Sequence, residues 1–144
     1  DETSDFYKRL YDEGLINSAF SSETFSGNGF FVPIFGGESR EPEKVAQLIA
    51  EEIERRKQAG FTKEEFETVR KAYYGSLIRS LGNPEAIAGG LIKAGLRGTG
   101  NAFSTIEAVA SVTAEDAAEF LRQRFDPENC TLSVIRSEEQ EDKA

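Results

Sequence analysis

The sequence contains no histidine, no methionine and no tryptophan, and its single cysteine is Cys130. Histidine is the commonest general base and the commonest transition-metal ligand. Its absence excludes Ser-His-Asp and Cys-His catalysis and H-E-x-x-H zinc sites on this chain alone. One cysteine cannot form an internal disulfide, a CxxC redox pair or a thiolate zinc cluster. We therefore expect no catalytic residue and no metal ligand on this chain.

Positive charge is scarce relative to negative charge. The chain has 26 acidic and 17 basic residues, which gives a net charge of -9 at pH 7. Such a chain is repelled by the phosphates of nucleic acids and by anionic membranes, so we expect neither as a partner.

Long apolar runs and targeting segments are also missing. No run approaches the roughly 18 residues that a membrane-spanning helix needs, and no signal peptide opens the sequence. We therefore expect a cytoplasmic protein. Because the chain begins at Asp1 and contains no methionine, we also expect it to be a processed product or a piece of something longer.

The residues that are present fit one globular domain. Hydrophobic residues make up 38% and charged residues 30% of 144 residues, a length that can bury a core without metals or disulfides. Apolar periodicity and capping residues predict helices over 4–15, 42–59, 62–81, 84–95, 105–110 and 113–125, a hairpin over 17–35 and a last strand over 130–135. The predicted caps are Ser4, Thr62, Asn83 and Thr113 at helix starts and Gly14 at the end of the first helix. The sequence thus predicts an α+β fold, with a small, mostly antiparallel sheet packed against several helices.

The same patterns predict which faces are buried. The nearly unbroken apolar run over 30–35 predicts a second hairpin strand covered on both faces, with Pro33 at an edge or a bulge because proline cannot donate to the ladder. Cys130 is expected as a small buried hydrophobe in the last strand. On the helix over 62–81, four residues share the face that we expect to be buried: Phe66, Val69, Tyr73 and Leu77.

Three short patterns suggest functional chemistry, but each has a simpler structural explanation. Gly95-x-x-Gly98-x-Gly100 has the wrong order for a dinucleotide fingerprint and follows a helix, so plain turn glycines are the favoured interpretation. Asn129-Cys130-Thr131 matches a glycosylation acceptor, which we attribute to chance. The acidic cluster in the helix over 42–59 is expected on a solvated face; it consists of Glu51, Glu52 and Glu54.

Positive and aromatic side chains share the helix over 62–81. One interpretation is a stripe of core tyrosines flanked by solvated charges, and this is the favoured one. The other is a wall that contacts a peptide or a partner domain. The residues concerned are Arg70, Lys71, Tyr73, Tyr74 and Arg79.

Taken in order, four segments resemble the insulinase/pitrilysin-type zinc metallopeptidases, the H-x-x-E-H inverzincins, and most of all their bacterial processing-peptidase-like branch. The likeness runs from about residue 4 to residue 136, and the order and spacing of the segments carry it. The segments are FYKRLYDEGLI at 6–16, FVPIFGGESREP at 31–42, GFTKEEF at 60–66 with the following RKAYYGSLIRSLGNPE, and VTAED at 112–116 with LSVI at 132–135.

This resemblance implies a two-part enzyme that closes around a peptide. The first half carries the zinc motif, and the second keeps the fold without the metal and helps to enclose the substrate. Because this chain has no histidine, it resembles the C-terminal part of a metal-free half, over residues 1–136. The resemblance further implies that strand and helix preceding Phe6 in the family are missing, so the domain is expected to be incomplete at its N-terminus. Residues 137–144 are expected to be a disordered acidic tail.

The implied partners follow from the same resemblance. They are a catalytic half-domain or partner subunit, which holds the zinc, and a peptide substrate. An exposed sheet edge would also allow a homodimer of this piece.

One departure from the family concerns substrate contact. Many members carry in this half an Arg and a Tyr, seven residues apart, that contact the substrate backbone. Aligned on Gly14-Leu15, these positions hold Leu10 and Asn17, and Arg9 points elsewhere on the helix. We therefore assign no substrate-binding residue. Two alternatives remain: a purely structural or assembly subunit, and an unrelated acidic interaction domain.

Overall fold

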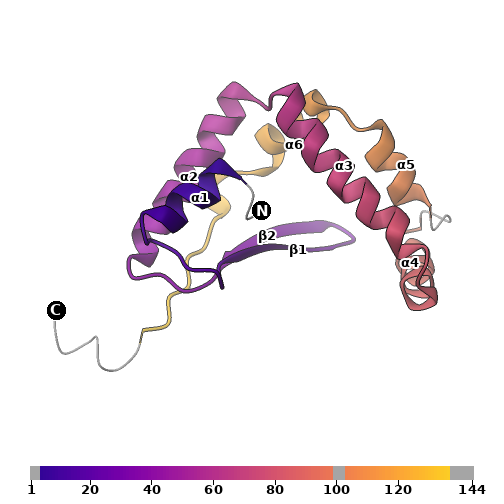
Figure 1. Cartoon of the computed structure of the whole chain (residues 1–144), viewed down its shortest axis with the longest axis horizontal. Coiled ribbons are helices and arrows are strands. Elements are labelled where there is room, and N and C mark those ends of the chain that lie inside the picture. Colours follow the sequence, from indigo (N-terminus) through magenta and orange to yellow (C-terminus); the bar gives the residue numbers. More distant parts are fainter. Residues whose placement is uncertain (1–3, 99–102, 137–144) are drawn as a thin grey trace. The chain divides into compact units, whose positions relative to one another are not determined.

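The computed structural model describes residues 4–98 and 103–136. This part of the chain forms six α-helices and one hairpin, which are labelled in Figure 1. The elements in order are α1 (Asp5–Asp12), β1 (Ser21–Gly27), β2 (Phe30–Gly36), α2 (Pro42–Ala59), α3 (Lys63–Ser80), α4 (Pro84–Arg97), α5 (Ser104–Ser111), α6 (Ala114–Arg124) and a 3-10 turn (Pro127–Asn129). The α+β prediction is confirmed, and each predicted helix is present. No helix among the described residues is long and apolar enough to cross a membrane.

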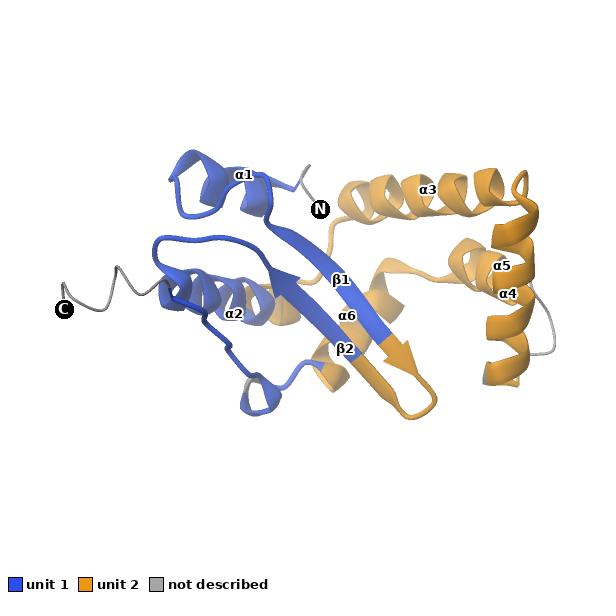
Figure 2. Ribbon diagram, turned by 90° about the horizontal axis from the view of Figure 1, so that it is seen from below, with its two compact units in different colours: residues 1–25, 32–54, 125–144 blue, residues 26–31, 55–124 orange. Residues whose placement is uncertain are grey.

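The chain forms two compact units, coloured separately in Figure 2. Unit 1 comprises residues 1–25, 32–54 and 125–144, and unit 2 comprises residues 26–31 and 55–124. The expected extent of the half-domain, residues 1–136, stays a prediction. The expected tail, residues 137–144, lies outside the described residues.

Unit 1 is built around the end of α1. The Ser4 hydroxyl caps α1 by accepting a hydrogen bond from the backbone N–H of Tyr7 at 3.2 Å. Gly14, with a φ of 68°, ends the helix in the left-handed conformation that glycine adopts most easily, and this turn carries the chain back onto α1. The buried residues are Leu10, Leu15, Ile16 and Val45, with Phe6, Tyr7, Phe20, Leu48 and Ile49 packed against them.

The hairpin turns at Asn28-Gly29, where Gly29 has a φ of 85°. The prediction that β2 is covered on both faces is wrong. Its apolar side chains Phe30, Phe31, Val32, Ile34 and Phe35 are each 40–46% exposed. The reason is that the described residues form only a two-stranded sheet, too small to provide a layer over both faces. Pro33 lies in an edge strand, as expected.

In unit 2, helix α3 begins with a capping box. The Thr62 hydroxyl accepts a hydrogen bond from the Glu65 N–H at 3.2 Å, and the Glu65 carboxylate accepts one from the Thr62 N–H at 2.9 Å. Asn83 likewise caps α4, and Thr113 with Asp116 caps α6. These three helix starts were predicted from the sequence and are confirmed.

The predicted buried face of α3 is only partly correct. Phe66 and Leu77 are half-buried, whereas Val69 is 61% and Tyr73 is 53% exposed. The Arg70 guanidinium instead faces α5 and donates a hydrogen bond to the Ala110 carbonyl oxygen at 2.8 Å. Arg70 lies about 40° around the helix from Phe66 and about 20° from Leu77, so α5 packs toward the edge of the predicted face that these two residues share, and the Val69 edge stays exposed.

The prediction of a last strand over 130–135 is also wrong. Residues 130–136 have no regular secondary structure, because no strand of the described part of the chain pairs with them. Cys130 is exposed rather than buried. An ion pair between Arg136 and Glu43 connects this segment to α2 within unit 1.

Candidate functional site

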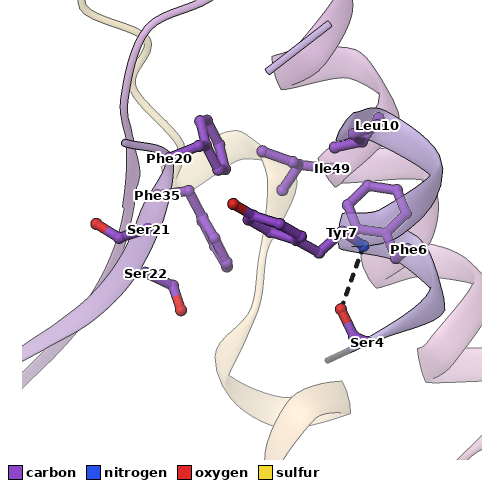
Figure 3. Close-up of a pocket in the computed structure, with 9 residues that line it drawn as sticks. All are labelled: Ser4, Phe6, Tyr7, Leu10, Phe20, Ser21, Ser22, Phe35 and Ile49. Atoms are coloured by element: carbon purple, nitrogen blue, oxygen red, sulfur yellow. Dashed lines mark hydrogen bonds between the residues drawn. The ribbon is translucent and has the colours of Figure 1, made fainter. Parts of the chain in front are cut away.

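A pocket of about 300 Å³ opens in unit 1, and Figure 3 shows its walls. One wall is α1, the facing wall is formed by the start of β1 and the end of β2, and α2 contributes from behind. The described residues that line it are Ser4, Phe6, Tyr7, Leu10, Phe20, Ser21, Ser22, Phe35 and Ile49.

Local sequence features create this pocket. Phe6, Tyr7 and Leu10 share one face of α1 because their spacing matches the helical repeat. Gly37, just after β2, lies so close to Phe20 that an added Cβ would be 2.5 Å from the Phe20 Cα. Only glycine permits this approach, which brings Phe20 and the end of β2 together.

The pocket is apolar with hydroxyl groups at its walls. None of the nine described lining residues is charged, and the polar groups come from Ser4, Ser21, Ser22 and Tyr7. The Tyr7 hydroxyl donates to the Asn17 carbonyl oxygen at 3.4 Å, so its ring is held at the pocket wall. The volume is at the lower end of the range for ligand sites and suits a single bulky apolar side chain.

Leu10 and Asn17, at the positions where many relatives have Arg and Tyr, lie in different environments. Leu10 is 1% exposed and belongs to the core. Asn17 is exposed, and its side chain donates to the Glu38 carboxylate at 2.7 Å and accepts from the Ala19 N–H at 2.9 Å. Asn17 thus joins two loops of unit 1, and neither residue presents a cationic or aromatic group.

The aromatic and basic stripe of α3 is not a core stripe. Tyr73 is 53% and Tyr74 is 38% exposed, so the favoured interpretation as core tyrosines is wrong. Arg79 and Lys71 are exposed, while Arg70 is bound to Ala110 and to the Glu67 carboxylate at 2.8 Å. Contact with a peptide or a partner domain stays a hypothesis for the exposed part.

Helix α4 is apolar on both sides. Its small residues Gly89, Gly90 and Ala94 are half-buried or buried. Its large residues point outward, with Leu91 56%, Ile92 63% and Leu96 73% exposed. Together with Ala88 and Gly95, these three follow the i, i+3, i+4, i+7, i+8 spacing of a continuous apolar stripe, which we call the α4 stripe.

The shifted pKa values in unit 2 belong to helix caps and ion pairs. Hydrogen bonds from Thr62, together with the Arg56 guanidinium at 2.9 Å, lower the pKa of Glu65 to about 2. Thr113 lowers the pKa of Asp116 in the same way. These carboxylates stabilise helix starts, and none of them lines the pocket.

The remaining sequence candidates are dispersed. Gly95 lies within α4, Gly98 ends it with a φ of 69°, and Gly100 lies outside the described residues. In the acidic cluster, Glu51 is exposed while Glu52 and Glu54 are half-buried, so only part of it is a solvated face. The described residues contain no group of three metal-ligating side chains.

Sequence reasoning missed the pocket residues in and next to the hairpin. Phe20, Ser21, Ser22 and Phe35 were assigned only to a hairpin. A signal was present, because an aromatic residue directly precedes the serine pair that opens β1 and another lies near the end of β2. That pattern does not reveal a pocket until α1 is placed against it.

A family model described as the Peptidase M16 inactive domain matches residues 1–73, which include every described residue of the pocket.

Two proteins are similar over most of the chain. The zinc protease YmfH of Bacillus subtilis (strain 168), itself uncharacterized, is 25% identical over 129 residues, covering 90% of this chain and 30% of that protein. A crystal structure described as that of an M16-like peptidase from Alicyclobacillus acidocaldarius superposes with a TM-score of 0.76 at 28% identity. It covers 84% of this chain and 29% of the other. The chain thus spans less than a third of the length of these relatives.

Proposed function

Since the chain belongs to the M16 peptidase family, as its inactive C-terminal domain, we propose that it forms a non-catalytic wall of a zinc-dependent peptidase. In this role it holds the zinc-bearing half of the enzyme and helps to enclose a peptide. Under this proposal the metal belongs to that other half, since this sequence has no histidine and the H-x-x-E-H zinc motif requires two. A cytoplasmic location stays a prediction.

The observation that carries this proposal is the α4 stripe. A helix that is apolar on both sides is normally buried on both sides. In α4 the small residues take the inner side and the branched aliphatic residues Leu91, Ile92 and Leu96 take the outer side. Such an arrangement suits a second protein surface, which supports contact with the zinc-bearing half.

The test is association between this chain and a zinc-bearing half-domain encoded on the same gene or beside it. Leu91→Asp should weaken the association by about tenfold or more, because a charge is then buried at the interface. Leu132→Asp is the matched control, since Leu132 is 53% exposed and lies outside α4. Equal effects of the two substitutions, or no association of the wild-type chain, would overturn the proposal. The chain alone should neither retain stoichiometric zinc nor cleave peptides.

A second candidate is an assembly subunit that holds a partner without touching substrate. The observation that favours it is the environment of Leu10 and Asn17, where one residue is buried and the other joins two loops. Peptide binding distinguishes the candidates: a complex whose catalytic glutamate is replaced should retain peptide if this chain forms part of the enclosure. An assembly subunit would leave that affinity unchanged when its own pocket is altered.

A further inference from the structure

The turn of the hairpin places a glycine directly after an asparagine. Asn28 and Gly29 connect β1 to β2, and Gly29 has a φ of 85°, in the left-handed region that favours glycine. Asparagine is itself a common turn residue. The turn therefore suits both residues, and the Asn-Gly pair occurs nowhere else in the sequence.

This pair is chemically labile. Asparagine is one of the unstable residues that heat-adapted proteins avoid. Asn28 and Gly29 are both exposed, and a Cβ added to Gly29 would meet no atom within 4 Å beyond the neighbouring residues. Because glycine has no side chain, its backbone nitrogen can approach the side-chain carbonyl carbon of the preceding asparagine without steric hindrance.

One hydrogen bond restrains the Asn28 side chain. Its amide nitrogen donates to the Leu96 carbonyl oxygen of α4 at 3.0 Å, and both residues belong to unit 2. While this bond is intact, the amide is held at the end of α4. A reaction of the amide with the backbone has to compete with this contact.

We propose that Asn28 is a site of spontaneous deamidation, which the bond to α4 slows and whose product releases α4. The Gly29 nitrogen attacks Cγ of Asn28, so that a bond between these two atoms forms and the Cγ–Nδ2 bond breaks. The amide leaves as ammonia with the proton of the Gly29 N–H, and a cyclic succinimide remains. Water from the solvent then opens the ring: breaking the new N–Cγ bond gives aspartate, and breaking the original peptide bond gives isoaspartate. No atom is oxidised or reduced, and no enzyme or partner is needed.

Either product changes the contact with α4. A carboxylate at position 28 has no N–H to donate, and its charge faces the Leu96 carbonyl oxygen. Isoaspartate also routes the main chain through the former side chain, which lengthens the turn by a methylene group. Because the length of the loop fixes the register of a hairpin, the pairing of β1 with β2 is disturbed as well. The modification thus loosens the end of α4, the helix that bears the α4 stripe.

Two other described asparagines serve as internal references. Asn83 precedes a proline, which has no N–H to lose, so its amide should stay intact. Asn17 precedes Ser18, whose side chain hinders the attack, and its amide donates to the Glu38 carboxylate at 2.7 Å. Trypsin releases Asn17 and Asn28 in one peptide, residues 10–40, so their reactions can be compared directly.

The first experiment incubates the 144-residue chain at physiological pH and temperature and follows this peptide by tandem mass spectrometry. Each deamidation replaces an NH2 group by OH, and fragmentation assigns it to one asparagine. Asn28 should react at least about tenfold faster than Asn17, a difference of about 1.4 kcal/mol in activation free energy. Both aspartate and isoaspartate should accumulate. Equal rates at the two positions would overturn the site, and aspartate without isoaspartate would overturn the succinimide route.

Two matched substitutions test the restraint by α4. Gly98 ends α4 with a φ of 69° and Gly14 ends α1 with a φ of 68°, and a Cβ added to either would meet no atom within 4 Å. Gly98→Ala strains the helix end that holds Asn28, so deamidation there should accelerate about threefold or more. Gly14→Ala applies the same strain in unit 1 and should leave the rate at Asn28 unchanged. Equal rates at Asn28 in the two variants would show that α4 does not control the reaction.

The wild-type chain keeps the test decisive if a variant fails to fold. Concentrated urea removes the bond to Leu96, so Asn28 should deamidate about fivefold faster in urea than in buffer. A rate that does not rise in urea would contradict the restraint. Modified chains separated by ion exchange then show whether α4 is released. Hydrogen exchange at its C-terminal end should be about threefold faster than in the unmodified chain, and equal exchange would refute the release.

Discussion

The side-chain amide of Asn28 donates a hydrogen bond to the Leu96 carbonyl oxygen at 3.0 Å. Asn28 lies at the hairpin turn and Leu96 in the last turn of α4, where helical carbonyls have no intrahelical partner. Within unit 2, one turn residue thus satisfies a helix end that is far away in the sequence. The hairpin tip and α4 should therefore be stabilised together.

Asn28→Asp removes the donor but keeps a residue that is suited to the turn. We expect a loss of about 1 kcal/mol in the free energy of unfolding, because the Leu96 carbonyl loses its partner and faces a carboxylate. Hydrogen exchange should accelerate at the C-terminal end of α4. Unchanged exchange there would show that the contact contributes nothing to stability.

The capping box of α3 gives a second prediction. Thr62→Ala should lower the free energy of unfolding by about 1 kcal/mol, because the Glu65 N–H loses its acceptor. Thr68→Ala is the matched control, since the Thr68 hydroxyl only donates to the Glu64 carbonyl oxygen inside the helix. Urea unfolding of both variants measures the difference. A larger loss for Thr68→Ala would contradict the importance of the cap.

The depressed pKa of Glu65 predicts a pH dependence with a definite sign. The pKa falls from 4.5 to about 2 on folding, so the charged carboxylate stabilises the folded state above pH 4.5. That contribution should decline as the pH falls from 4.5 towards 2. Glu65→Gln keeps the hydrogen-bonding shape of the cap without the charge. The stability difference between wild type and variant should therefore be largest near neutral pH, and a difference that grows on acidification would refute this assignment.

Leu10 gives a fourth prediction, which concerns its role as a core residue. Leu10→Ala should cost about 2–5 kcal/mol of stability, because the side chain is almost completely buried and leaves a cavity. Leu132→Ala removes the same atoms from an exposed position and should change stability by no more than about 0.5 kcal/mol. Thermal unfolding followed by circular dichroism compares the two. Similar melting temperatures for the two variants would show that Leu10 does not stabilise the core.

Local signals in the sequence predicted the helices well. Ser4, Thr62, Asn83 and Thr113 cap their helices as expected, because a cap depends only on residues within one turn. The glycine after α1 also ends that helix as predicted. The α+β class follows directly from these elements and the Asn28-Gly29 turn.

Burial could not be predicted in the same way, since it depends on which distant segment covers a face. The spacing of Val69 and Tyr73 indicates an apolar face, but it does not show that α5 packs toward the edge of that face nearest Arg70 and leaves the Val69 edge exposed. The segment over 130–135 has the composition of a strand, but a strand forms only where another one pairs with it. The pocket was missed for the same reason, because Phe35 lines it only once α1 lies opposite.

Pro33 would limit any association of copies through the hairpin. Because this residue has no N–H and interrupts the β2 edge, a strand of another copy would have to pair with the β1 edge. Two hairpins that join through their β1 edges leave no further complete edge, so such an association ends at a dimer and cannot grow into a fibre.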